Sequence, residues 1–218
     1  METLKQFSQK LFHYIHGELR GLNLTAIKDE EEFLIKQVED SLQPFYISNT
    51  LKDNKNLYFL DVGFGGGFPL IPLAKCFPEK FFLGIDGRAK KVNGVKKIIE
   101  YLQLKNVQVL HYRLEDIYID YKIILLFKAV GKVSEILPLV SGISGVKCFF
   151  LKGQNFNEQE GIIGSIGPVR QFPQFTCIEN TSYEIPESNI QRILVGYELV
   201  HNHLQNVTKR LVKISELF

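Results

Sequence analysis

The chain has 218 residues, 45% of them hydrophobic and 23% charged, which suits one globular domain with a substantial core and excludes a disordered chain. No apolar run reaches the roughly 18 residues that a membrane helix needs, and the amphipathic start lacks the layout of a signal peptide, so we expect a cytoplasmic protein without membrane contact. A formal net charge of +2 is too small to indicate nucleic-acid binding by itself.

The first fifty residues carry apolar side chains at the three- and four-residue spacings that are typical of helices. One such stripe predicts a helix over residues 3–19, and a second predicts a helix over residues 33–47. We therefore expect residues 1–50 to form a helical cap in front of a core at residues 51–218, the whole chain being a single domain.

From Leu57 onward, short apolar runs alternate with longer helical patterns, which is typical of βαβ units and a mostly parallel sheet. The predicted strands are Leu57–Val62, Phe81–Ile85, Val107–His111, Tyr121–Phe127 and Val146–Leu151. The predicted helices between them are Pro69–Cys76, Ala89–Leu102 and Val133–Val140. Three later segments alternate more and leave no room for helices, so we expect antiparallel edge strands at Phe175–Ile185, Gln191–Val200 and Lys209–Ile214.

The run LDVGFGGGFPLIPLA at residues 60–74 places a buried strand before D-x-G-x-G-x-G and a helix after it. Gly63, Gly65 and Gly67 fall in the turn, where glycine permits positive φ and lets the backbone approach a ligand closely. Glycine is common in any turn between a strand and a helix, but here Asp61 and the flanking elements appear in the order of a cofactor loop.

A second acidic residue, Asp86, ends the next strand in FLGIDG, about 25 residues after Asp61. A carboxylate at this point can accept hydrogen bonds from both hydroxyls of a cofactor ribose. The G-x-G-x-G spacing differs from the G-x-G-x-x-G of dinucleotide binders, which favours S-adenosylmethionine over a nicotinamide cofactor. After the third strand, HYRLED places Arg113, Leu114 and Glu115 where they would flank an adenine ring, although a solvated acidic turn is the alternative.

These residues resemble the small-subunit ribosomal RNA guanine methyltransferases, also called glucose-inhibited division protein B. The resemblance covers residues 22–193 and depends on LDVGFGGGFPLIPLA, on NLTAI at Asn23–Ile27 and on DSL at Asp40–Leu42. LKNVQVLHYRLED, KAV and LKGQ follow in the order that the family has. The implied fold is the Rossmann-like class I S-adenosylmethionine methyltransferase fold, with a helical cap.

The resemblance implies transfer of a methyl group from S-adenosylmethionine to ring nitrogen 7 of one guanine in small-subunit (16S) ribosomal RNA. It implies that Gly63, Phe68, Leu114, Glu115 and Lys128 contact the cofactor and that Asp86 lies near the ribose. The polar positions near the reaction centre would be Asn23, Gln37, Arg113, Lys128, Lys152 and Arg192. The partner would be ribosomal RNA or the small ribosomal particle, and we expect a monomer.

Two positions depart from the family pattern. Gln37 stands where the family has histidine before D-S-L, and Lys128 stands where it has arginine, so the charge is kept but the planar fork is lost. These departures leave two alternatives open: a paralogue with another substrate, and a cofactor-binding module without catalysis that holds RNA or a partner. A third reading, a nicotinamide oxidoreductase, is disfavoured by the glycine spacing and by the lack of an assignable hydride-transfer acid or base. We expect no metal, because no histidine pair has a cysteine or carboxylate set to complete its coordination.

Overall fold

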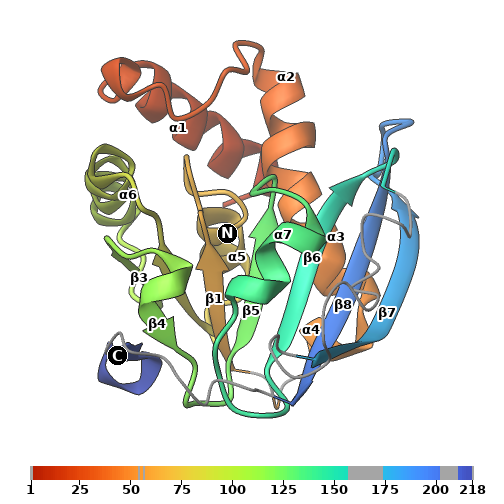
Figure 1. The fold of residues 1–218 in the computed structure, drawn as a ribbon. Coiled ribbons are helices and arrows are strands. Elements are labelled where there is room, and N and C mark those ends of the chain that lie inside the picture. Colours follow the sequence, from red (N-terminus) through yellow and green to blue (C-terminus); the bar gives the residue numbers. More distant parts are fainter. Residues whose placement is uncertain (1, 54, 56, 157–173, 202–210, 218) are drawn as a thin grey trace.

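A computed structural model describes residues 2–53, 55, 57–156, 174–201 and 211–217, and a seven-stranded sheet forms its centre (Figure 1). The strand order is β3-β2-β1-β5-β6-β8-β7. The strands are β1 (Tyr58–Val62), β2 (Phe81–Ile85), β3 (Val107–Leu110), β5 (Ile124–Lys128), β6 (Lys147–Gly153), β7 (Gln174–Glu184) and β8 (Gln191–His201). The first five of these in sheet order run parallel, whereas β8 is antiparallel to β6 and to β7. The predicted mostly parallel sheet with antiparallel C-terminal strands is confirmed.

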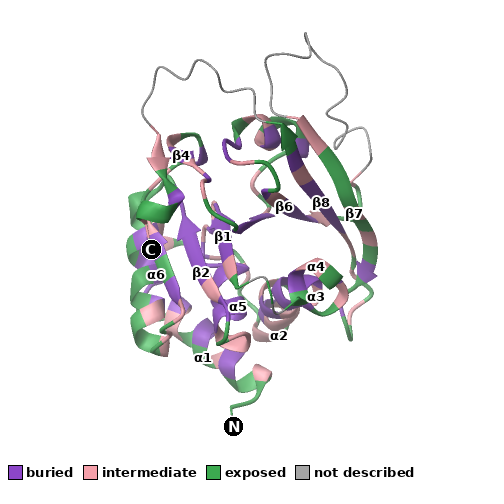
Figure 2. Cartoon of the chain, turned by 90° about the horizontal axis from the view of Figure 1, so that it is seen from below, coloured by how far each residue is buried: buried purple, intermediate pink, exposed green. Residues whose placement is uncertain are grey.

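The central strands β1, β2, β5 and β6 are buried on both faces, and their successive side chains enter different hydrophobic layers, whereas the edge strand β7 is largely exposed. In β1, Phe59 joins the layer formed with the N-terminal helices and two crossover helices, and Leu60 joins the opposite layer. Figure 2 shows the buried strands between helices whose outer surfaces are exposed. The crossover helices are α5 (Leu70–Cys76), α6 (Ala89–Leu102) and α7 (Val133–Ile136), the last continued by η4 (Leu137–Leu139).

The predicted N-terminal cap consists of helices that pack on α5 and α6. They are α1 (Leu4–His16), η1 (Arg20–Leu22), α2 (Glu30–Phe33), η2 (Leu34–Glu39), α3 (Asp40–Ile47) and α4 (Asn49–Lys52). The second helical stretch begins at Glu30, earlier than predicted, because the Asp29 side chain accepts the amide of Glu32 and caps it. Its segment η2 is π-helical, a local widening that often occurs at functional sites.

Two predicted strands differ from the structure. Residues 121–123 are loop, so β5 begins only at Ile124. The prediction of an antiparallel edge strand at residues 209–214 is wrong for its described part: β9 (Val212–Lys213) pairs parallel with β4 (Ile117–Tyr118) in a separate two-stranded sheet. Burial of the adjoining Ile214 accounts for this position, because that side chain fills the core layer opposite the cap.

Short 3-10 turns complete the fold at η3 (Leu114–Asp116) and η5 (Ile214–Glu216). Within the described ranges no helix combines the length and the hydropathy needed to cross a bilayer.

Candidate functional site

The glycine loop joins β1 to α5 at the carboxyl edge of the sheet, where ligands bind in open α/β folds. Gly63, Gly65 and Gly67 have φ values of 72°, 58° and 95°, as the loop pattern predicts. Gly63 donates its amide to the Ile85 carbonyl at 2.7 Å, which closes the turn against β2. A Cβ atom on Gly67 would lie 2.9 Å from the Ile71 side chain, so this position also requires glycine for packing.

A pocket of about 270 Å³ opens beside this loop, at the carboxyl ends of β1, β2 and β3. It brings together four residues that the sequence assigned to the cofactor, Gly63, Asp86, Leu114 and Glu115, and one that it assigned to the reaction centre, Arg113. Its remaining walls are largely apolar or backbone and come from Val62, Ile85, Gly87, Arg88, Tyr112, Val130, Ile136 and Leu139. Five residues from three separate stretches of sequence thus share one small cavity.

The Asp86 carboxylate is fully occupied by protein donors. Oδ1 accepts from the backbone amide of Arg88 at 2.8 Å and from its Nε at 3.0 Å. Oδ2 accepts from the Gly65 amide at 3.0 Å and from Arg88 Nη2 at 2.9 Å. Burial alone would raise the pKa of Asp86, but the hydrogen bonds from Arg88 and Gly65 hold it below its ordinary value. A ligand hydroxyl can therefore reach this carboxylate only by replacing the Arg88 guanidinium.

Asp61, on β1, is buried and carries an unsatisfied oxygen. Its Oδ2 accepts the Leu70 amide at 3.1 Å, whereas Oδ1 is buried and has no hydrogen-bond partner in the protein. Burial raises the pKa of Asp61 to about 8, against the opposing influences of the Leu70 amide and Lys128. With this pKa the group is mainly the neutral acid at neutral pH, and a cationic ligand group beside Oδ1 would favour its ionised form.

A second group of charges lies at the same edge, at the ends of β5 and β8. Asp40 Oδ2 is 3.0 Å from Lys128 Nζ, and Asp40 Oδ1 is 2.9 Å from Arg192 Nε. Lys128 also donates to Ser41 Oγ at 3.3 Å. Burial lowers the pKa of Lys128, and the neighbouring Asp40 carboxylate opposes this effect. One carboxylate thus holds two cations that are far apart in the sequence.

The sequence assigns no role to Asp40 beyond its place in the D-S-L motif. Asp40 is 4% exposed and therefore needs a partner for its charge, and two of the four cations assigned to the reaction centre supply it. The burial of Asp40 is visible only in the structure. The pattern could not show that Lys128 contacts Asp40, because the two residues are 88 positions apart. The assignment of Lys128 to the cofactor and of Arg192 to the reaction centre stays a prediction.

The NLTAI segment lies directly against the glycine loop. A Cβ atom on Gly66 would lie 2.1 Å from the Leu24 carbonyl oxygen, so Gly66 is needed for this close approach. Asn23 has a left-handed backbone, with φ of 48°, and its carbonyl accepts from Lys91 of α6. Gln37 Nε2 is 3.5 Å from Thr25 Oγ1, which links this segment to the π-helical turn.

Two other predicted residues lie away from the pocket. Phe68 is 8% exposed and packs edge-on against Phe33 at 5.5 Å between ring centroids, inside the cap. Lys152, on β6, donates to the Gly131 carbonyl at 2.9 Å and lies 5.6 Å from the Phe156 ring centre. Neither residue lines the 270 Å³ cavity.

Residues 3–161 match the family model GidB, described as rRNA small subunit methyltransferase G. Curated proteins named ribosomal RNA small subunit methyltransferase G are similar to this chain. The one from Acetivibrio thermocellus is 37% identical over 119 residues, which cover 55% of this chain and 43% of that protein. The one from Malacoplasma penetrans is 34% identical over 154 residues, covering 66% and 62%.

In these two relatives the matched segment therefore spans about half the length of the protein. The similarity to the protein of that name from Actinobacillus succinogenes extends further, with 29% identity over 199 residues that cover 88% of this chain and 85% of that one.

Among solved structures, magnesium protoporphyrin IX methyltransferase from Synechocystis, with bound SAM, has a TM-score of 0.53 and 15% identity and covers 88% of this chain and 96% of its own. A mutant of MtNAS in complex with S-adenosylmethionine has a TM-score of 0.53 and 12% identity, covering 91% and 77%. At these identities the likeness shows the fold alone, and it confirms the predicted class I methyltransferase fold.

Proposed function

Because this chain belongs to the GidB family of rRNA small subunit methyltransferase G proteins, we propose that it methylates small-subunit ribosomal RNA, using S-adenosylmethionine, at ring nitrogen 7 of a guanine. The observation that carries the proposal is the pocket at the carboxyl edge, which gathers Gly63, Asp86, Leu114 and Glu115 beside the glycine loop. Residues 1–218 would act as a single domain and a monomer in the cytoplasm.

The residues present fit S-adenosylmethionine. Asp86 offers the carboxylate that two ribose hydroxyls require, and Leu114 and Val130 offer apolar contact for a purine. The buried Oδ1 of Asp61 has no protein partner and suits the ammonium of the methionine moiety. When bound, S-adenosylmethionine supplies a sulfonium methyl group that is open to attack by a nucleophile. Gly63, Gly65 and Gly67 would form the floor of this site by presenting backbone without side chains.

The chemistry requires positioning rather than proton transfer. Ring nitrogen 7 of guanine has a lone pair and no proton, so the enzyme needs no general base. In-line placement of the two reactants can supply about 7 to 11 kcal/mol of the barrier. Methylation places positive charge on the guanine ring, and Asp40 partly neutralises Lys128 and Arg192 at the same edge. Asp40 would therefore limit the repulsion between these cations and the product.

Cations at the carboxyl edge would bind the RNA. We assign Arg113, Lys152 and Arg192 to phosphates or base edges, and Asn23 to the same face. Arg113 supports this role because its side chain is 69% exposed and stands at the rim of the pocket, 3.9 Å from Glu115. Arg192 lies beyond residues 3–161, which match the family model. Its assignment to RNA binding is supported by the hydrogen bond from its Nε to Asp40 Oδ1, which orients the guanidinium at this edge.

The proposal is tested by incubating the full chain with labelled S-adenosylmethionine and small-subunit RNA that lacks its natural modifications. We expect label in the RNA, and none with Gly65→Val, whose side chain would block the close approach of the loop backbone. Binding of S-adenosylmethionine without transfer to any ribosomal RNA would favour a diverged paralogue or a binding module. Binding of a nicotinamide cofactor in its place would overturn the proposal.

A further inference from the structure

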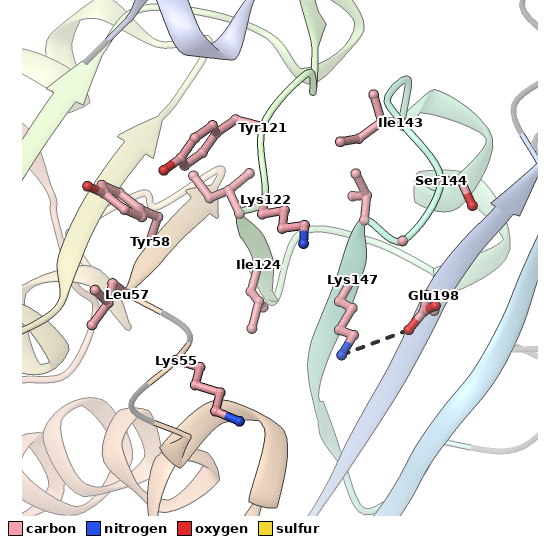
Figure 3. Close-up of a pocket in the computed structure, with 13 residues that line it drawn as sticks. Lys55, Leu57, Tyr58, Tyr121, Lys122, Ile124, Ile143, Ser144, Lys147 and Glu198 are labelled. Atoms are coloured by element: carbon pink, nitrogen blue, oxygen red, sulfur yellow. Dashed lines mark ion pairs between the residues drawn. The ribbon is translucent and has the colours of Figure 1, made fainter.

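A second and larger pocket, of about 570 Å³, lies at the opposite edge of the sheet, at the amino ends of β1, β5 and β6 (Figure 3). The loop before β5 and the turn before β6 form its walls. β1 and β5 each have five residues, so this pocket lies about one strand length, roughly 16 Å, from the carboxyl edge. It is therefore separate from the proposed methyl-transfer site.

Positive charge predominates in this pocket. Lys55, Lys122 and Lys147 reach the same hollow from three segments, as Figure 3 shows. Glu198 is the only acidic residue among those that line it, and its carboxylate lies 3.9 Å from Lys147 Nζ. Three ammonium groups thus face one carboxylate, which leaves an excess of two positive charges for an anionic ligand.

Aromatic surface lies on one wall of the same pocket. The rings of Tyr58 and Tyr121 lie edge to face at 87°, with their centroids 5.4 Å apart. Tyr121 is 42% exposed. Leu57 and Ile143 add apolar surface nearby. Lysines beside exposed aromatic rings are the combination that binds a phosphate together with an unpaired base.

We propose that this pocket binds a phosphate and an adjacent unpaired base of the ribosomal RNA substrate, as a second contact remote from the methylated guanine. The inference rests on the proposed function, because a nucleic-acid substrate is what makes RNA the occupant. A folded ribosomal RNA is large enough to present phosphates at both edges of the sheet, whereas a short oligonucleotide around the target guanine is not. The contact would add affinity without taking part in methyl transfer.

The test compares Lys122→Ala/Lys147→Ala with a control of equal charge change, Lys5→Ala/Lys10→Ala, at two exposed lysines of α1, a helix that contributes no residue to the pocket. Affinity for small-subunit RNA is measured by filter binding across a series of salt concentrations. Each lost phosphate contact lowers the slope of log affinity against log salt by about 0.7 to 0.9. We expect the slope to fall by about one or two in the pocket variant and to stay unchanged in the control.

Three further readouts separate this inference from others. Tyr121→Leu should weaken RNA binding about fivefold or more and Tyr121→Phe should restore it, because a base can stack on either aromatic ring. The pocket variants should keep the wild-type rate of methyl transfer at saturating RNA, and their affinity for S-adenosylmethionine should not change. Failure of the proposed function would show separately, as the absence of methyl transfer by the wild type. Unchanged affinity and slope in the pocket variant would overturn the inference. Binding of adenosine monophosphate or inorganic phosphate here, with no effect on RNA affinity, would also overturn it and indicate a small-ligand site.

Discussion

In the proposed binding mode, Arg88 would compete with the cofactor ribose for Asp86, so removal of Arg88 should tighten cofactor binding. The Arg88 guanidinium donates twice to the carboxylate, at 3.0 and 2.9 Å, and its side chain is 62% exposed whereas that of Asp86 is 3% exposed. A charged pair with one solvated partner contributes about 1 kcal/mol. The open state, in which Arg88 has left Asp86, then lies about 1 kcal/mol higher in free energy than the paired state and is populated about one time in six. If only the open state binds the cofactor, the apparent dissociation constant is raised about sixfold.

Arg88→Leu should therefore lower the dissociation constant for S-adenosylmethionine about five- to sixfold, as measured by titration calorimetry. Lys90→Leu is the matched control, since it removes the same charge from an exposed position two residues further along, and it should leave the affinity unchanged. Weaker binding by Arg88→Leu would refute the reasoning, because it would mean that the guanidinium contacts the cofactor instead of competing with it.

Three further predictions concern the same edge. Asp40→Asn leaves Lys128 and Arg192 without their shared carboxylate and should lower the free energy of unfolding in urea by about 3 kcal/mol; a loss below about 1 kcal/mol would contradict a buried ion-pair role. The folded-state pKa of Asp61, about 8, is above its ordinary value of 3.8, so its stabilising contribution is complete below pH 3.8 and is lost as pH rises through 8. Relative to Asp61→Asn, the free energy of unfolding of the wild type in urea should fall by about 1.4 kcal/mol per pH unit between pH 5 and 7. If the free energies of unfolding of the two proteins change in parallel with pH, Asp61 is not protonated in the folded state. Gly66→Ala should destabilise the fold by about 1 to 3 kcal/mol by forcing the loop away from Leu24, whereas Gly21→Ala, with nothing within 4 Å, should be neutral by the same assay; equal effects would discount the close approach.

The sheet could be predicted because its signals are local. Buried parallel strands appear as short apolar runs, and the glycine loop places Asp61 and Gly63 at a strand end whatever the rest of the chain does. The pocket at this edge could also be predicted, since Asp86 ends the neighbouring strand and the carboxyl ends of parallel strands meet at one edge. Leu114 and Glu115 join the same pocket for that reason.

What the sequence could not give are the contacts between distant segments. The two cations of the Asp40 group come from strands that are not neighbours in the chain, and Asp40 itself follows a π-helical turn that no periodicity indicates. The parallel pairing of β9 with β4 was missed because a two-residue strand has no pattern, and burial of Ile214 decides its place. The contact of Arg88 with Asp86 was not predicted, because it depends on how the turn between β2 and α6 folds back.

Mapping of the methylated atom tests the central claim most directly. Small-subunit RNA labelled by this chain would be digested to nucleosides and compared with methylated guanosine standards, and the modified position would then be located in the RNA sequence. We expect label on ring nitrogen 7 of a single guanine. Label on another atom or base, or on protein and not on RNA, would contradict it, because the positioning chemistry proposed for this site requires a nucleophile that has no proton to lose.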